Sequence, residues 1–278
     1  MEDNSANGGA LRRAAIPGLP DETYIMEDRA VERVLFGRDL VGAEFARVCL
    51  EASLGFCRLL APRLDVPDIA ELLILNGGRY YGLATAYERV FGRSLPVDEL
   101  KATRRQDPDG AWVADISYRR YAHKPRTLLI GDTVATGVSA RVALADYFAY
   151  HTPTELIFFT ICGAITGARL IAAACAERGV RLTLVFGVAA FGLADNGTDL
   201  PFLHPDTRTA PRHLERARGL RRPACLRHWR LGRARRGPRR LPRQLGARQA
   251  GVRARVGDEY QRTQRALTQP RAPLRCAT

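Results

Sequence analysis

Residues 127–140 hold the side chains whose types and spacing are best suited to chemistry. The apolar run Thr127–Ile130 predicts a buried strand, and the periodicity of Val138–Tyr150 predicts a helix. Hydroxyls, a glycine and the carboxylate of Asp132 lie in the turn between them. The free N–H groups of a helix start bind phosphate, whereas a carboxylate repels it. Asp132 therefore indicates a ligand that carries hydroxyls or a metal beside its phosphate, such as a ribose phosphate.

The same turn resembles the ribose-phosphate motif of type I phosphoribosyltransferases, in which an apolar strand precedes two acids, two variable residues and a Thr-Gly turn closed by Ser or Thr. Uracil phosphoribosyltransferases provide a similar variant, with the core seen here at Ala135-Thr136-Gly137. Gly131 replaces the first acid, which leaves Asp132 to hold the ribose hydroxyls. An ordinary strand–turn–helix corner is the alternative. The resemblance implies that the ligand is bound by Asp132, Thr133, Val134, Ala135, Thr136, Gly137, Val138, Ser139 and Ala140.

A glycine pair follows the apolar run Glu71–Leu75 and predicts a second binding loop. Gly77 and Gly78 allow the backbone to approach a ligand closely. The resemblance implies that this loop holds the pyrophosphate of phosphoribosyl pyrophosphate. Asn76 stands where uracil-specific members carry an arginine, a charge for which nearby Arg79 is a candidate replacement. A plain turn between strand and helix is the alternative.

The β-prone segments on either side of Asp107–Gly110 predict a hairpin with its tip at that turn. The resemblance implies that the hairpin closes over the pyrophosphate and that Arg104 or Arg105 reaches it. A guanidinium suits this role because its fork binds phosphate oxygens in pairs. Asp132 and Arg104 are therefore the predicted catalytic residues. A solvated charged hairpin is the alternative.

Segment 187–207 follows the last predicted strand and is rich in turn-forming residues. It lacks the Pro-Gly-Leu-Gly-Asp-Ala-Gly-Asp signature with which uracil phosphoribosyltransferases read the base. His204 is a candidate general base or stacking residue, although a lone loop histidine is more often structural. Asp195 and Asp199 flank an Asn-Gly turn and are expected to be turn residues rather than ligands.

The alternation of apolar strands with helical segments predicts the α/β class, with a parallel twisted sheet flanked by helices. Beyond the motifs above, we expect strands at 156–161 and 181–186 and a helix at 163–176. Helices are also expected at 23–36, after Asp21 and Glu22, and at 40–60, where the apolar residues suit core or dimer packing. Ligands of such sheets bind at the carboxyl ends of the strands, so the predicted loops should converge at one edge.

Charge divides the chain into two parts. Residues 206–278 contain 21 arginines, no lysine and four acids, a net charge of +17 against +14 for the whole chain. We expect a disordered N-terminus over 1–20, one folded domain over 21–207 and a disordered Arg-rich tail over 208–278. Three interpretations of the tail stay open: a basic arm that binds nucleic acid, a solvated extension, and the product of a frameshift in a GC-rich gene.

These observations predict transfer of a phosphoribosyl group from phosphoribosyl pyrophosphate to a nitrogenous base. The resemblance also implies a homodimer and Mg²⁺ that is carried on the substrate pyrophosphate rather than by protein ligands. A non-catalytic sensor of the same ligand and a nucleic-acid-binding regulator are the alternatives. The six cysteines show no metal-binding spacing, and the chain shows no signal peptide or membrane-spanning run. We therefore expect a cytoplasmic protein without a membrane partner.

Overall fold

The computed structural model describes residues 9–37, 39–106, 108 and 112–219, which lie in one compact unit of the chain. The strands of its central sheet are β1 (Ala10–Arg13), β2 (Thr23–Glu27), β3 (Ile69–Leu75), β4 (Val97–Gln106), β5 (Trp112–Arg120), β6 (Thr127–Gly131), β7 (Glu155–Thr160) and β9 (Arg181–Phe186). Their order is β1-β2-β9-β7-β6-β3-β4-β5. From β2 to β4 every neighbouring pair is parallel, whereas the edge pairs are antiparallel. The predicted α/β class with a mainly parallel sheet is confirmed.

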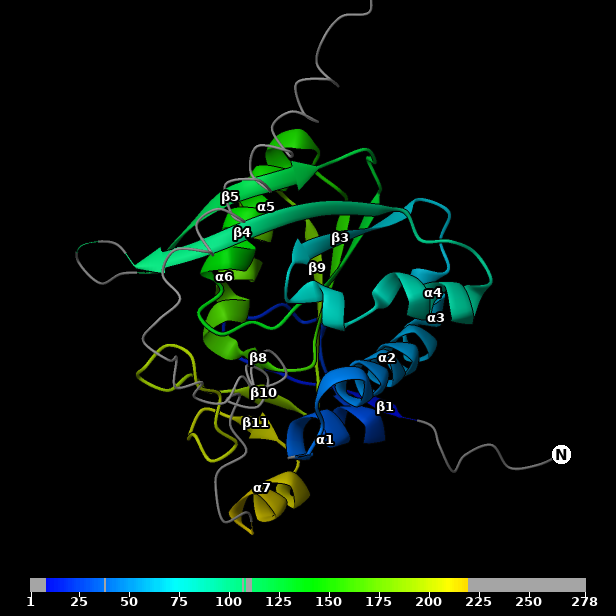
Figure 1. The fold of residues 1–278 in the computed structure, drawn as a ribbon. Coiled ribbons are helices and arrows are strands. Elements are labelled where there is room, and N and C mark those ends of the chain that lie inside the picture. Colours follow the sequence, from blue (N-terminus) through cyan, green and yellow to red (C-terminus); the bar gives the residue numbers. More distant parts are fainter. Residues whose placement is uncertain (1–8, 38, 107, 109–111, 220–278) are drawn as a thin grey trace, which may run out of the picture. The chain divides into compact units, whose positions relative to one another are not determined.

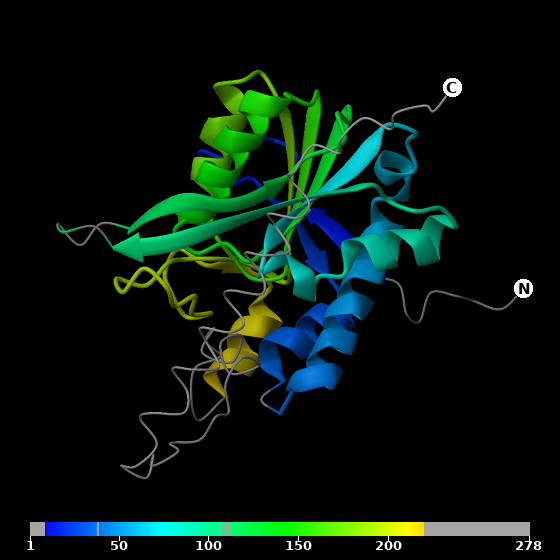
Figure 2. The ribbon, with the colours of Figure 1, turned by 45° about the horizontal axis from the view of Figure 1, so that its top comes forward.

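Helices cover both faces of this sheet (Figure 1, Figure 2). One layer contains α1 (Arg29–Phe36), α2 (Gly42–Leu59), α3 (Ala61–Leu64) and α4 (Leu83–Phe91), and the other contains α5 (Val138–Tyr150) and α6 (Ile165–Ala176). Successive strand residues face opposite layers: Leu129 packs into the core beside α2, whereas Leu128 and Ile130 pack beside α5 and α6. No helix in the described ranges is both long and apolar enough to cross a membrane.

A second, small sheet lies beyond the carboxyl ends of the central strands. It consists of β8 (Gly163–Ala164), β10 (Ala189–Phe191) and β11 (Arg208–Thr209), in the order β11-β10-β8. β8 also forms a bridge to Val134, in the turn after β6. The small sheet thus ties the segment after β9 to the turn after β6, which places two predicted binding segments side by side.

The N-terminal segment differs from the prediction. The sequence predicts a helix over residues 23–36, but β2 forms the first part of this segment and only α1 is helical. Ile25 and Met26 of β2 are fully buried, and β2 pairs with β9. Burial in the sheet therefore overrides the local helical pattern. The side chain of Asp28 begins α1 by accepting two backbone N–H groups of its first turn.

The described fold begins before residue 21 and continues past residue 207. β1 lies within the segment expected to be disordered, and the Ala14 and Ile16 side chains just after it are buried. At the other end, α7 (Pro211–Arg218) lies in the first part of the predicted tail. Composition alone indicates disorder for such short charged segments, whereas strand pairing and packing order them here. Residues 1–8 and residues 220–278, which are the rest of the predicted tail, lie outside the described residues.

Candidate active site

A cavity of about 500 Å³ lies at the carboxyl edge of the central sheet. Four segments line it: the loops that follow β3 and β6, the hairpin strand β4, and the loop after β10. Of the residues predicted to bind ligand, Gly78, Thr136 and Val138 are not in the lining. The lining consists of Ile74, Leu75, Asn76, Gly77, Tyr80, Ala102, Arg104, Asp132, Thr133, Val134, Ala135, Gly137, Ser139, Ala140, Asn196, Thr198 and Asp199.

Asp132 follows β6 directly and lines the cavity with only 8% of its surface exposed. Its Oδ1 accepts the backbone N–H of Thr133 at 2.8 Å. Burial raises the pKa of Asp132 to about 7, although this hydrogen bond and the charge of Arg104 oppose the rise. A hydroxyl donor or a cation in the cavity would favour the ionised form, so the state of this carboxyl depends on what is bound.

The start of α5 forms one end of the cavity, since Gly137, Ser139 and Ala140 line it. The first N–H groups of a helix have no intrahelical partner, and the helix dipole adds positive potential there. Gly137 has a left-handed φ of 82°, and a Cβ on it would lie 2.6 Å from the carbonyl oxygen of Gly167 in α6. Conformation and space therefore both require glycine at 137. This end of the cavity is suited to bind an anion.

The two hydroxyls predicted to bind phosphate occupy different environments. Ser139 lines the cavity, whereas Thr136 does not. The Oγ1 of Thr136 is buried and has no hydrogen-bond partner among the described residues. A buried polar group without a partner costs about 1–3 kcal/mol, a cost that a phosphate oxygen bound within the turn would relieve.

The loop after β3 packs closely against the Asp132 turn. Gly77 has an ordinary helical φ of −60°, yet a Cβ on it would collide with the Asp132 carboxylate. A Cβ on Gly78 would lie 3.0 Å from the carbonyl oxygen of Gly131. The Leu75–Asn76 peptide bond, which precedes the glycines, is cis. Both glycines are therefore needed for space, so that the two loops can approach each other.

Arg104 lines the cavity from β4, whereas Arg105 pairs with Asp115 at 3.0 Å on the surface of the hairpin. Successive residues of a strand point in opposite directions, so these two arginines cannot serve the same ligand. Arg79, the candidate to replace the charge missing at Asn76, is exposed and is not in the cavity lining. Of the two arginines that the sequence offered, the geometry favours Arg104.

Tyr81 supports the site from behind, a role that the sequence analysis missed. The side chain is fully buried, and its hydroxyl accepts the backbone N–H of Ile161 at 3.0 Å. The same hydroxyl lies 3.3 Å from Thr133 Oγ1. Burial raises the pKa of Tyr81, so the phenol stays protonated. Tyr81 thus connects the residue after Asp132 to the loop after β7, and a tyrosine following a glycine pair carries no local sign of this role.

The loop after β10 forms a wall of the cavity, as expected for the segment after Phe186, but the sequence analysis missed that Asn196, Thr198 and Asp199 are the residues that line it. Asn196 Oδ1 accepts the backbone N–H groups of Thr198 and Asp199 at 3.0 and 2.9 Å. Its Nδ2 donates to Asp199 Oδ2 at 2.9 Å. These three residues line the cavity, so Asp199 belongs both to the turn and to the site. His204, the candidate general base, is not in the lining, and its Nδ1 accepts the backbone N–H of Asp206.

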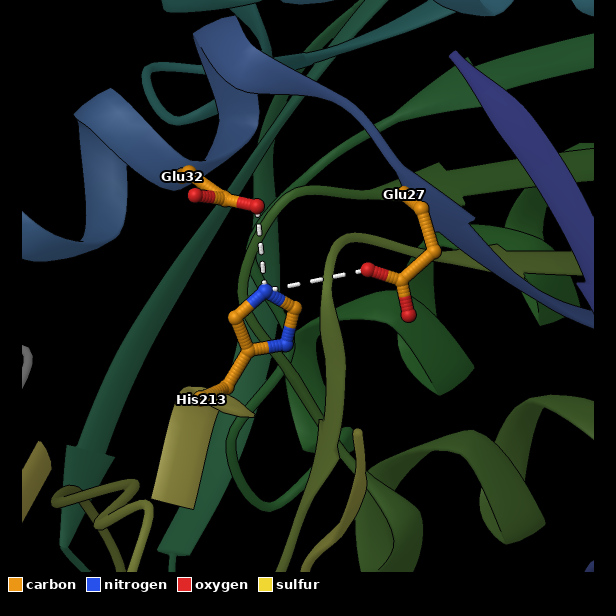
Figure 3. Close-up of side chains that lie close together, drawn as sticks. All are labelled: Glu27, Glu32 and His213. Carbon is orange, nitrogen blue, oxygen red and sulfur yellow. Dashed lines mark hydrogen bonds and ion pairs between the residues drawn. The ribbon is translucent and has the colours of Figure 1, made fainter. Parts of the chain in front are cut away.

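A separate cluster of charged side chains joins α7 to α1 (Figure 3). The Nε2 of buried His213 lies 3.1 Å from Glu32 Oε1 and 3.7 Å from Glu27 Oε2. Within the described ranges, these three form the one His/Cys/Asp/Glu group close enough to hold a metal ion. Arg212 and Arg216 already pair with the two carboxylates. We therefore interpret the cluster as a salt-bridge network that anchors α7, not as a cation site.

No protein-family model matches the chain, and no curated protein matches it significantly. Solved structures match at a distance. The AQ2163 protein of Aquifex aeolicus matches 61% of this chain and 86% of its own, at 16% identity and a TM-score of 0.48. The Trypanosoma brucei adenine phosphoribosyltransferase matches 76% of this chain and 99% of its own, at 12% identity and a TM-score of 0.43. The Mycobacterium tuberculosis orotate phosphoribosyltransferase matches 57% of this chain and 89% of its own, at 20% identity and a TM-score of 0.32. All three similarities lie at or below 20% identity and below a TM-score of 0.5.

Proposed function

We propose that this chain binds phosphoribosyl pyrophosphate and transfers its phosphoribosyl group to a nitrogenous base, as type I phosphoribosyltransferases do. One observation carries the proposal: the buried carboxylate of Asp132 lines a single cavity together with the start of α5 and the glycine loop after β3. An anion-binding helix start, a carboxylate for hydroxyls and a second loop match the phosphate, ribose and pyrophosphate of this substrate. An ordinary strand–turn–helix corner has no need of a buried carboxylate in a cavity wall.

Each part of the substrate has a suitable partner in the lining. The 5-phosphate fits the free N–H groups at the start of α5 and the hydroxyl of Ser139. Asp132 accepts hydrogen bonds from the ribose hydroxyls, since an ionised carboxylate is an acceptor only. The pyrophosphate fits the backbone of Gly77 and the guanidinium of Arg104.

The site suits Mg²⁺ that arrives on the pyrophosphate. Mg²⁺ prefers hard oxygen ligands and is commonly held by one or two carboxylates together with substrate phosphates. Asp132 supplies such a carboxylate beside the pyrophosphate loop. When bound, the ion neutralises the charge that develops on the leaving pyrophosphate. Arg104 contributes a fixed positive charge to the same cavity.

The transfer exchanges one bond at C1 of the ribose. The C1–O bond to pyrophosphate breaks, and its electron pair stays on the leaving oxygen. A ring nitrogen of the base forms the new bond to C1, and the proton that this nitrogen loses passes to the released pyrophosphate. Positive charge develops on the ribose ring during the exchange, where ionised Asp132 stabilises it. The protein otherwise acts by holding the two substrates in line.

A non-catalytic sensor of the same ligand is the second candidate, and the packing around Gly131 favours it. Gly131 occupies the first acidic position of the motif. A Cβ there would lie 2.7 Å from the Leu83 side chain and 2.9 Å from that of Tyr81. A second acid therefore cannot be placed at position 131 without repacking, and Asp132 is left as the one acid of the motif that can hold the ribose. A site with one acid in place of two favours binding of the ligand without turnover.

Calorimetric titration of the full chain with phosphoribosyl pyrophosphate and Mg²⁺, joined to an assay of pyrophosphate release, tests the proposal. Asp132→Asn should weaken binding at least tenfold, because the amide loses the charge and one acceptor oxygen. Asp195→Asn, an exposed site outside the lining, should leave it unchanged. Release of pyrophosphate with a base supports the transferase, and binding without release across a panel of bases supports the sensor. If the wild-type chain does not bind the ligand, or if Asp132→Asn binds it equally well, both assignments fail.

A further inference from the structure

The loop after β10 contributes one carboxylate to the cavity, in the part to which no group of phosphoribosyl pyrophosphate has been assigned. The start of α5, Asp132, and the Gly77 loop with Arg104 are assigned to phosphate, ribose and pyrophosphate. The remaining charged group in the lining is Asp199. Under the proposed function, Asp199 therefore borders the incoming base.

The hydrogen bonds of the loop leave Asp199 available to a ligand. Asn196 Nδ2 donates to Asp199 Oδ2 at 2.9 Å, which orients the carboxylate. The Oδ1 of Asn196 is occupied by the N–H groups of Thr198 and Asp199 and by the Thr198 hydroxyl. No donor in the described ranges contacts Asp199 Oδ1. The loop thus lines the cavity with a carboxylate that is held through one oxygen and has no described donor on the other.

The chemistry of this oxygen restricts the ligand. An ionised carboxylate accepts hydrogen bonds and donates none. An amino group of a base can donate to it, in a charge-assisted bond that is stronger than a neutral one. A carbonyl oxygen in the same place would meet like partial charge and would leave Asp199 Oδ1 without a donor. Tyr80, whose ring packs against Phe45, is the aromatic side chain in the lining of the same cavity.

We propose that the acceptor is a heterocyclic base with an exocyclic amino group, which donates a hydrogen bond to the Asp199 carboxylate. This inference rests on the proposed function and narrows it to aminopurines or aminopyrimidines. Asn196 acts as the positioning residue for Asp199, because it holds both the turn and one carboxylate oxygen.

Three matched pairs of bases test the inference: adenine with hypoxanthine, guanine with xanthine, and cytosine with uracil. Each pair exchanges an amino group for an oxo group. Binding of each base to the wild-type chain is measured in the presence of phosphoribosyl pyrophosphate and Mg²⁺, together with release of pyrophosphate. At least one amino base should bind, and it should bind at least tenfold more tightly than its oxo partner, which is the discrimination expected of a charged hydrogen bond.

Asp199→Asn should remove most of this preference, since an amide can both donate and accept. The control Asp195→Asn changes an exposed acid of the same loop outside the lining and should keep the preference. Tighter or equal binding of the oxo members, binding of no amino base, or an unchanged preference in Asp199→Asn would overturn the inference. The inference would also be overturned if Asp199→Asn lost binding of phosphoribosyl pyrophosphate but kept the preference for amino bases. The titration without a base separates this failure from that of the proposed function, because phosphoribosyl pyrophosphate would still bind to the wild-type chain.

Discussion

Gly77 and Asp132 pack against each other so closely that no side chain fits between them. A Cβ on Gly77 would collide with the carboxylate oxygen Oδ1 of Asp132. The φ of Gly77 is −60°, a value open to every residue, so glycine is needed here for space alone. The contact joins the loop after β3 to the turn after β6, which are the two segments that the proposed function assigns to pyrophosphate and ribose.

Gly77→Ala should therefore displace the Asp132 carboxylate and weaken binding of phosphoribosyl pyrophosphate at least tenfold. We expect the same change to lower the free energy of unfolding by about 1–3 kcal/mol through overpacking. Calorimetric titration and thermal unfolding measure the two effects. Gly219→Ala is the matched control, since Gly219 has a similar φ of −68° and its added Cβ would meet its nearest atom only at 3.6 Å. Equal affinity in the wild type and Gly77→Ala would contradict the assignment of this contact.

The raised pKa of Asp132 predicts a pH-dependent stability. Its pKa is about 7 in the folded chain against 3.8 for an unperturbed Asp. Between pH 3.8 and about pH 7 the folded state therefore binds more protons than the unfolded state. Stability therefore falls as pH rises from about 4 to about 7 and stays low above. Asp132→Asn removes this loss, and we expect it to stabilise the ligand-free chain by up to about 4 kcal/mol at pH 8 and about 2 kcal/mol at pH 5. Denaturant unfolding at the two pH values measures the difference, and a gain that is equal at both would rule out this carboxyl as the cause.

The contact between Gly137 and Gly167 should control the shape of the turn between β6 and α5, which the proposed function assigns to phosphate and which we call the phosphate turn. Gly167→Ala raises the helix propensity of α6 by about 1 kcal/mol. Its Cβ, however, would lie 2.5 Å from the carbonyl oxygen of Ala135 in the turn. We expect the clash to dominate, with a net loss of about 1–3 kcal/mol in stability and weaker binding of phosphoribosyl pyrophosphate.

Ala173→Gly provides the control for this variant, because Ala173 is an exposed residue of the same helix. It should cost about 1 kcal/mol of stability without any change in affinity. If both variants lose affinity in proportion to stability, the phosphate turn does not depend on Gly167 specifically.

Arg104 and Arg105 form a matched pair for the role of the hairpin. Arg104→Ala should raise the dissociation constant of phosphoribosyl pyrophosphate by about 10- to 150-fold, the range for loss of a charged hydrogen bond. Arg105→Ala should change it less than about twofold, since Arg105 makes an exposed ion pair with Asp115. Titrations with both variants compare the two values directly. Similar losses for both would show that the hairpin acts through its overall charge rather than through one side chain.

Local patterns predicted the strands, loops and helix that surround the candidate site. The apolar run before Asp132 and the helix from Val138 are both present, at nearly the predicted bounds. The glycine loop after β3 and the hairpin of β4 and β5 are present as well. These features depend on periodicity and turn residues over a few positions, which the sequence displays directly.

The roles of other residues were not predicted because they depend on segments that are distant in the sequence. Tyr81 meets the backbone of Ile161, and nothing near Tyr81 in the chain indicates this partner. Asp199 has the local sequence of a turn residue, and its place in the lining depends on how the loop after β10 packs. The strand Thr23–Glu27 was predicted as helix because its pairing with β9 is not visible locally.

The sequence by itself determined the α/β alternation, the turn that follows β6 and the positions of the glycines, because each depends on residues that are neighbours in the chain. The tertiary structure decided which side chains share the cavity: Arg104 rather than Arg105, Ser139 rather than Thr136, and Asp199 in addition. The physical reason is that a site is assembled from segments far apart in the chain. Which atoms meet there is set by strand order, the direction of each side chain and the space that the packed glycines leave.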